Sequence, residues 1–380
     1  MSSTDYSINV FFDLLRAGLW ENSRKFRFEV LEPIESVDWE EVYRLASEQS
    51  VLGLVLAGIE TLSNEQRPPK QVLLQWIGEV QMLEQQNKEM NDFIAVLVDR
   101  MRKAGVYALL VKGQGIAQCY ERPLWRSCGD VDLLLDRENY EKAKSFLIPL
   151  AGQVDEEDRD ILHQGMKLDQ WTVELHGTML MGITGRINRV LVETQQAIFN
   201  GGEVRFWQNG KVPVYLPSPD NDIILVFAHI LMHFFIGGVG LRQICDWCRL
   251  LYIFKDSLNY GLLESRIRRM GLMSEWRAFY ALATKYLGMP EVPCFMFQDS
   301  ADPQWERKAD RIMELVLESG NFGHNYDYSY RRKYSGLRSH LITFVRRLGE
   351  FTRIAIIFPV DAPKFFCHYV MNRFMAKLKK

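Results

Sequence analysis

The stretch GDVDLLLD, residues 129–136, most constrains what this chain can fold into. A short apolar run that follows a glycine is typical of a buried strand. Because side chains alternate along a strand, Asp130 and Asp132 point to one face while Val131 and Leu133 point to the other. Two carboxylates this close repel each other unless a cation lies between them. The stretch therefore predicts either a cation site or a pair of solvent-facing residues at a strand end.

A mixed region of strands and helices surrounds this motif. VYALLVKG, from residue 106, is a β-branched apolar run that indicates a buried strand, and a short helix is expected before Pro123. Residues 137–150 predict a helix. WTVELHGTML, from residue 171, predicts a third strand. Residues 202–216 predict a hairpin that turns at Asn209-Gly210.

Helical patterns dominate both sides of this region. Asp38 is expected to cap a helix, with Glu41 reaching back to it, and Ser218 with Pro219 opens another. We therefore expect an α+β fold in which a small mixed β-sheet core is flanked by N-terminal and C-terminal helical regions. The expected boundaries are 1–102 for the N-terminal helical region, 103–217 for the core and 218–380 for the C-terminal helical region.

The composition excludes several classes of protein. The 380 residues carry a formal net charge of -2, which gives no overall attraction to nucleic acid. Cys245 and Cys248 form one CxxC, but no second pair completes a zinc site, so two small buried residues are the favoured interpretation. Scattered free thiols fit a reducing compartment. We find no secretory signal and expect no transmembrane segment, which together predict a cytoplasmic protein.

Two further motifs have the chemistry of a phosphate and metal site. Lys112-Gly113-Gln114 follows a predicted strand and opens a short helix, an arrangement whose N–H groups suit phosphate, although it also fits a simple tight turn. Glu174 lies on a predicted strand with His176 on the same face. If that strand lies beside the first, three carboxylates can hold two metal ions, or hold one and supply a base. Otherwise Glu174 is an exposed residue on a half-buried strand.

In their order and spacing, these motifs resemble the DNA polymerase β-like nucleotidyltransferase superfamily and, more narrowly, a bacterial family of uncharacterised nucleotidyltransferases. The resemblance covers roughly residues 36–255 and depends on these features: DWEEVYRLASEQSV, Lys112-Gly113, Arg126 before DVDLLL, the ELH of Glu174 to His176, His229 with His233, and GLRQICDW. One difference is Gln114, which stands where many members of the superfamily have a serine that helps to hold the terminal phosphates.

The resemblance implies a metal-dependent nucleotidyltransferase that moves a nucleoside monophosphate from a nucleoside triphosphate, with ATP favoured, to an unknown hydroxyl acceptor and releases pyrophosphate. The acceptor is a small molecule or a protein, and nucleic acid is less favoured. Two Mg²⁺ ions would be held by Asp130, Asp132 and Glu174, which are the implied catalytic residues. The implied nucleotide-binding residues are Lys112, Gly113, Gln114, Arg126 and Arg242. The alternative is a catalytically inactive nucleotide- or partner-binding protein with the same fold, as the replacement at Gln114 suggests.

Several residues have two interpretations. Arg126 can contact phosphate or pair with an aspartate, and Arg242 can meet the triphosphate or pair with Asp246 one helical turn away. His229 and His233 have a spacing that suits zinc, but no third ligand is apparent, so a packed helix stripe is favoured. The aromatic and basic C-terminal region predicts an amphipathic closing helix, with contact to a membrane surface or RNA as the alternative.

Overall fold

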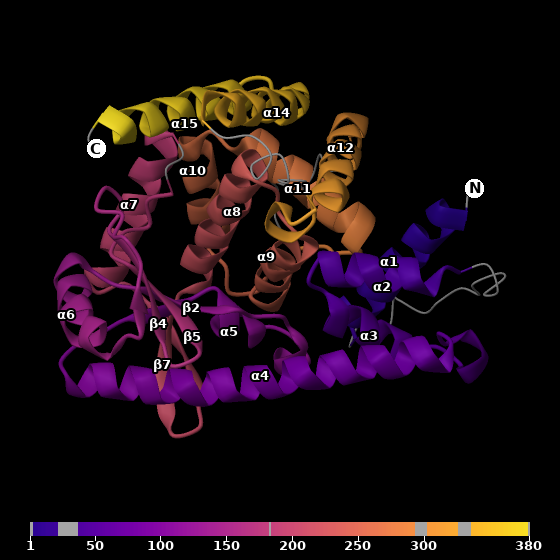
Figure 1. Cartoon of the computed structure of the whole chain (residues 1–380), viewed down its shortest axis with the longest axis horizontal. Helices are drawn as coiled ribbons and strands as arrows, with labels where there is room; N and C mark the ends of the chain where they lie inside the picture. The colour runs from indigo at the N-terminus through magenta and orange to yellow at the C-terminus, as the bar shows by residue number, and fades with distance from the viewer. Residues whose placement is uncertain (1–2, 22–36, 182–183, 293–301, 326–335, 379–380) are drawn as a thin grey trace.

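The computed structural model describes residues 3–21, 37–181, 184–292, 302–325 and 336–378. A small sheet lies between helices, which confirms the expected α+β class (Figure 1). The long helix α4 runs beneath both the sheet and the N-terminal helices, while α14 and α15 cross the opposite side of the molecule (Figure 1).

The main sheet has five strands in the order β1-β2-β5-β4-β3. Their bounds are β1 Leu109–Val111, β2 Asp130–Leu134, β3 Gln153–Val154, β4 His163–Leu168 and β5 Trp171–His176. β2 and β5 are parallel, and the other neighbouring pairs are antiparallel, so the sheet is mixed as expected. The strands predicted around residues 106, 129 and 171 are β1, β2 and β5. β3 and β4 were not predicted.

The helices that accompany the sheet match the predictions closely. The helix predicted over residues 137–150 is α6 (Arg137–Leu147), in the crossover from β2, and its Tyr140, Ala143 and Leu147 are buried. The helix ends earlier than predicted: Leu150 lies in the 3-10 turn that follows and is 47% exposed. The remaining elements of this region are α5 (Gly113–Ala117), α7 (Gly185–Phe199), β6 (Val204–Asn209) and β7 (Val212–Pro217). β6 and β7 form the predicted hairpin, with Gly210 in the left-handed region at φ 59°.

Helices occupy both flanks. The N-terminal set is α1 (Ser3–Leu19), α2 (Trp39–Glu48), α3 (Leu52–Glu60) and α4 (Lys70–Lys103). The C-terminal set is α8 (Pro219–Ile236), α9 (Leu241–Ile253), α10 (Tyr260–Met270), α11 (Met273–Leu287), α12 (Pro303–Ser319), α14 (Gly336–Ile357) and α15 (Asp361–Leu378). Asp38 caps α2 as predicted by accepting from the Glu41 N–H, but the Glu41 side chain pairs with Arg44 instead of reaching back.

The buried apolar residues form two clusters. One lies between the main sheet, α6 and the second half of α4. The other joins the N-terminal helices to α8, α9, α11 and α12, and the Trp20 indole donates to the Leu287 carbonyl at 2.6 Å across that junction. The two helical regions therefore share one core, although the chain separates them by the whole sheet. The three-part division at 102 and 217 stays a prediction.

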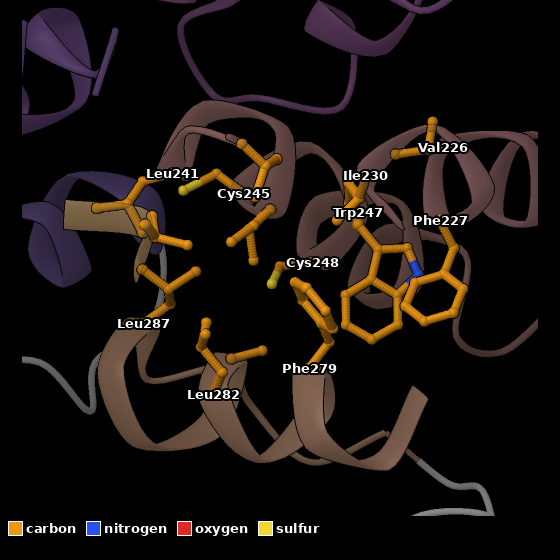
Figure 2. Packing of buried hydrophobic residues seen from close by; sticks show 14 of the residues in the cluster. Val226, Phe227, Ile230, Leu241, Cys245, Trp247, Cys248, Phe279, Leu282 and Leu287 are labelled. Carbon is orange, nitrogen blue, oxygen red and sulfur yellow. The ribbon is translucent and has the colours of Figure 1, made fainter. Parts of the chain in front are cut away.

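The centre of the shared core contains the CxxC pair. Figure 2 shows Cys245 and Cys248 of α9 among apolar side chains of α8 and α11, close to Trp247 and Phe279. Both thiols are free, and burial raises the pKa of each well above its usual value. The pair is structural, as expected, because these thiols are protonated and enclosed by hydrocarbon.

α8 is the helix, among the described residues, with the length and composition of a membrane span. Its 18-residue window has a mean hydropathy of 1.3, and 61% of that window is buried inside the protein. A core helix of a globular protein has the same properties, so this observation is weak evidence for a membrane span.

Candidate active site

The three predicted carboxylates meet on the sheet. In the parallel β2–β5 pair, Asp132 lies opposite Glu174, and Asp130 precedes Asp132 on the same face. All three line one cavity of about 1030 Å³. The cavity is also lined by Lys112, Gly113, Arg126, His163, His176, His229, His233, Arg242, Asp246 and Tyr369, with apolar residues that include Ile161, Met179, Met181, Met232 and Ile236.

Asp132 is the most strongly held of the three carboxylates. It is 2% exposed, and its Oδ1 accepts hydrogen bonds from Lys112 Nζ at 2.9 Å and His176 Nε2 at 2.7 Å. Burial alone would raise the pKa of Asp132, but Lys112 and His176 outweigh it and hold that pKa far below its usual range. Burial lowers the pKa of His176, so the imidazole is neutral and donates through Nε2.

The pKa of Asp130 is shifted in the opposite direction to that of Asp132. Burial, followed by repulsion from Asp132, raises the pKa of Asp130 to about 6. Part of this shift is repulsion between the two aspartates, which adds to the effect of burial. A divalent cation among the carboxylates of Asp130, Asp132 and Glu174 would relieve this repulsion, and their oxygen donors are those that Mg²⁺ prefers. The donor set therefore fits the predicted metal.

His163 on β4 is a site residue that the sequence did not reveal. Its Nε2 lies 3.2 Å from Glu174 Oε2, and burial is outweighed by Glu174, which raises the pKa of His163. The sequence signal for β4 is weak: Met166 and Leu168 alternate with Lys167, and Asp169-Gln170 then forms a tight connection to β5. That pattern predicts a hairpin whose first strand begins near His163.

The Lys-Gly turn faces the carboxylates. Lys112 has φ 56°, which is unusual for a residue with a side chain, and Gly113 has φ 40°. A Cβ on Gly113 would lie 3.1 Å from Cys128 Sγ, so the turn is also crowded. The structure brings Lys112 and Gly113 to the cavity, but it turns the Gln114 side chain away. That side chain is 1% exposed and donates to Asn87 Oδ1 at 2.7 Å.

The two arginines lie at the junction between the core and α9. Arg126 makes a two-point ion pair with Asp246, at 3.1 Å from Nε and 2.5 Å from Nη2. Tyr120 also donates to Asp246. Arg242 donates to the Ser127 carbonyl at 3.0 Å, and the charge of Asp246 also acts on it. Both arginines line the cavity.

His229 and His233 form part of the opposite wall. Their Nε2 atoms are 3.1 Å apart, so one imidazole donates to the other. Burial lowers the pKa of both, and that of His233 falls to about 4. The group of three or more potential metal ligands found among the described residues does not include them. The favoured interpretation of a helix stripe beside the cavity is thus in keeping with their positions.

The family comparison identifies the protein as a nucleotidyltransferase, an enzyme whose substrate is a nucleotide. The chain belongs to the uncharacterised nucleotidyltransferase family, whose model matches residues 35–288. The match covers most of the chain and extends past the end of the resemblance seen in the sequence. Comparison with curated proteins and with solved structures gives no match.

Proposed function

We propose that this enzyme transfers a nucleoside monophosphate from a nucleoside triphosphate, with ATP favoured, to a hydroxyl acceptor, and that it works in the cytoplasm. The observation that carries the proposal is the pairing of Asp132 with Glu174 across β2 and β5, with Asp130 beside them in one large cavity. The same arrangement supports membership of the DNA polymerase β-like superfamily.

Magnesium is the proposed cofactor, with two ions expected. Asp130, Asp132 and Glu174 would hold the two ions, because Mg²⁺ binds carboxylates and the phosphates of a nucleotide substrate. Bound magnesium would neutralise the triphosphate and lower the pKa of the acceptor hydroxyl.

The other residues of the cavity would position the substrates. Lys112 now neutralises Asp132, and its Nζ would turn to the terminal phosphates when a cation takes over that carboxylate. Gly113 offers a backbone N–H that a side chain does not shield. Arg126 and Arg242 lie near enough to the cavity to contact phosphate or acceptor, although Arg126 is already engaged by Asp246.

The chemical step is a substitution at the α-phosphorus. The acceptor oxygen bonds to that phosphorus, the bond to the bridging oxygen breaks, and pyrophosphate leaves with the electron pair. Glu174, whose side chain is 30% exposed, would either lower the pKa of the acceptor hydroxyl through the bound metal or take its proton directly. Positioning and charge neutralisation would supply most of the rate.

The cavity supports a small acceptor or a protein side chain. Its volume of about 1030 Å³ lies at the upper end of the range for small-molecule sites, roughly 300–1,000 Å³. A nucleotide would leave room for a compact acceptor against the apolar wall that includes Met179, Met232 and Ile236. We favour an acceptor with an apolar part for this reason.

Pyrophosphate release tests the proposal. Purified protein with ATP, Mg²⁺ and a cell lysate should release pyrophosphate and transfer label from α-labelled ATP. Asp130→Asn should reduce the rate at least about 100-fold, since it removes charge that acts on the reacting phosphates. Asp99→Asn is the matched control, because Asp99 lies on α4 and pairs only at the surface with Lys103. Equal rates for Asp130→Asn and the unmodified protein would refute the assignment.

A further inference from the structure

Two imidazoles and one carboxylate converge in the cavity from neighbouring strands. His163 of β4 and His176 of β5 are register partners, and their ring centroids are 4.9 Å apart. Glu174 lies two residues before His176, on the same face of β5. Its Oε2 is 3.2 Å from His163 Nε2 and 3.6 Å from His176 Nε2. Three donor atoms are therefore within reach of one point.

The two separations between Glu174 Oε2 and the imidazole nitrogens are those of ligands around one small cation. Ligand atoms that bind zinc at about 2.0–2.2 Å stand roughly 3.0–3.6 Å from one another in a compact coordination shell. One donor atom from each of the three residues can be chosen so that all lie within 4.8 Å of one another. Small side-chain adjustments suffice to close such a shell, because the two strands already fix the directions of all three side chains.

The surroundings favour a cation at this point. His176 Nε2 donates to Asp132 Oδ1 at 2.7 Å, so a cation bound at Nε2 would replace that proton next to a carboxylate, and Asp130 adds a further carboxylate to the same cavity. Lys112 offsets one of these charges through its ion pair with Asp132. All three ligands line the cavity, so a bound cation would have room for water or substrate, as in catalytic zinc sites.

We propose that His163, Glu174 and His176 bind a divalent transition-metal ion of the zinc class, beside the magnesium of the proposed function. The two imidazole nitrogens favour zinc over magnesium at this site, because imidazole suits zinc whereas magnesium prefers oxygen ligands. Glu174 belongs to both donor sets and would link the two cations. The inference rests on the proposed function only through this shared carboxylate.

Zinc binding by the full chain tests the site. Protein stripped of metal with a chelator is titrated with Zn²⁺ by calorimetry in excess Mg²⁺, and Co²⁺ is added in parallel to follow its visible absorption. We expect one Zn²⁺ per chain. His163→Ala should weaken Zn²⁺ binding by more than about 100-fold, because loss of an outer-shell partner alone costs 10- to 100-fold. It should also abolish the Co²⁺ bands.

Two further variants make the result specific. His324→Ala removes an exposed imidazole far along the chain and should leave Zn²⁺ affinity unchanged. His163→Gln retains much of the side-chain volume and a donor toward Glu174, so it keeps the test valid if His163→Ala does not fold. Unchanged affinity in a folded His163 variant, or no Zn²⁺ binding by the unmodified protein, overturns the proposal. Zinc binding without pyrophosphate release would refute the proposed function and leave this site standing.

Discussion

His176 Nε2 lies 2.7 Å from Asp132 Oδ1, between two neighbouring parallel strands. The same carboxylate oxygen accepts from Lys112 Nζ, so a neutral imidazole and an ammonium share one acceptor. The buried carboxylate is thus satisfied before substrate arrives. Removing either donor should have consequences for stability as well as for catalysis.

Lys112→Met should destabilise the fold by roughly 3 kcal/mol, because it leaves the buried Asp132 without its cation. Lys112→Met/Asp132→Asn should recover part of that loss, since the second change removes the unpaired charge. Urea unfolding of the two variants measures both effects. Lys103→Met is the control and should change the free energy of unfolding by less than about 0.5 kcal/mol, because its pair with Asp99 is exposed. Equal losses for Lys112→Met and Lys103→Met would contradict the prediction.

Gln114→Ser should lower stability without strengthening nucleotide binding. The Gln114 amide donates to Asn87 Oδ1, and Asn87 in turn donates to the carbonyls of Leu124 and Arg126. Serine is too short to replace that hydrogen bond and leaves a buried acceptor unsatisfied, at a cost of roughly 1–3 kcal/mol. Thermal unfolding with and without ATP and Mg²⁺ measures both quantities. A larger ATP-induced shift in the variant would mean that residue 114 faces the phosphates after all.

Arg126→Lys should weaken the junction between the core and α9. Lysine keeps the positive charge but loses the two-point pairing with Asp246, so we expect a loss of roughly 1–3 kcal/mol. Arg44→Lys is the matched control, because Arg44 makes its ion pairs at the surface of α2. Chemical unfolding compares the two. The same loss in both variants would show that burial of the Arg126 pair has no special effect.

Glu275→Gln should raise stability at pH 8 but not at pH 5. Glu275 is 0% exposed, and burial, followed by the charge of Asp361, raises its pKa to about 8. Between its unfolded pKa near 4.5 and about 8, the unfolded state loses this proton while the folded state keeps it, so stability falls as the pH rises. The variant should therefore gain roughly 3–4 kcal/mol at pH 8.

Urea midpoints at the two pH values check this prediction. Glu314→Gln is the control, since Glu314 is exposed on α12. A gain for Glu275→Gln that is equal at pH 5 and pH 8 would contradict the proposed cause, because at pH 5 both the folded carboxyl and the amide are neutral.

β2 and β5 could be predicted as strands because each is a short apolar run, and alternation places Asp130 and Asp132 on one face. Whether the two strands are neighbours, and so whether Glu174 joins the aspartates, stayed open until the structure showed their parallel pairing. His163 has only a weak sequence signal, because Gly165 and Lys167 interrupt the apolar composition expected of a buried strand in β4. Strand pairing, not propensity, makes that segment a strand.

The partners of Gln114 and Asp246 lie beyond what spacing can reveal. A five-residue helix gives no periodicity from which to tell whether Gln114 faces the cavity or the core. Asp246 has Arg242 one turn away, yet it pairs with Arg126, 120 residues earlier in the chain. Burial favours the pair between Arg126 and Asp246, because two hydrogen bonds satisfy both charges in a region without access to water.

Tyr369 of α15 lines the cavity, although it lies 81 residues beyond the matched segment that ends at residue 288. The carboxylates and the Lys-Gly turn all fall inside that segment, so the cavity combines the family-matched part of the chain with a side chain from outside it. A substitution at Tyr369 can therefore reshape the wall of the cavity and leave the carboxylates and the Lys-Gly turn as they are.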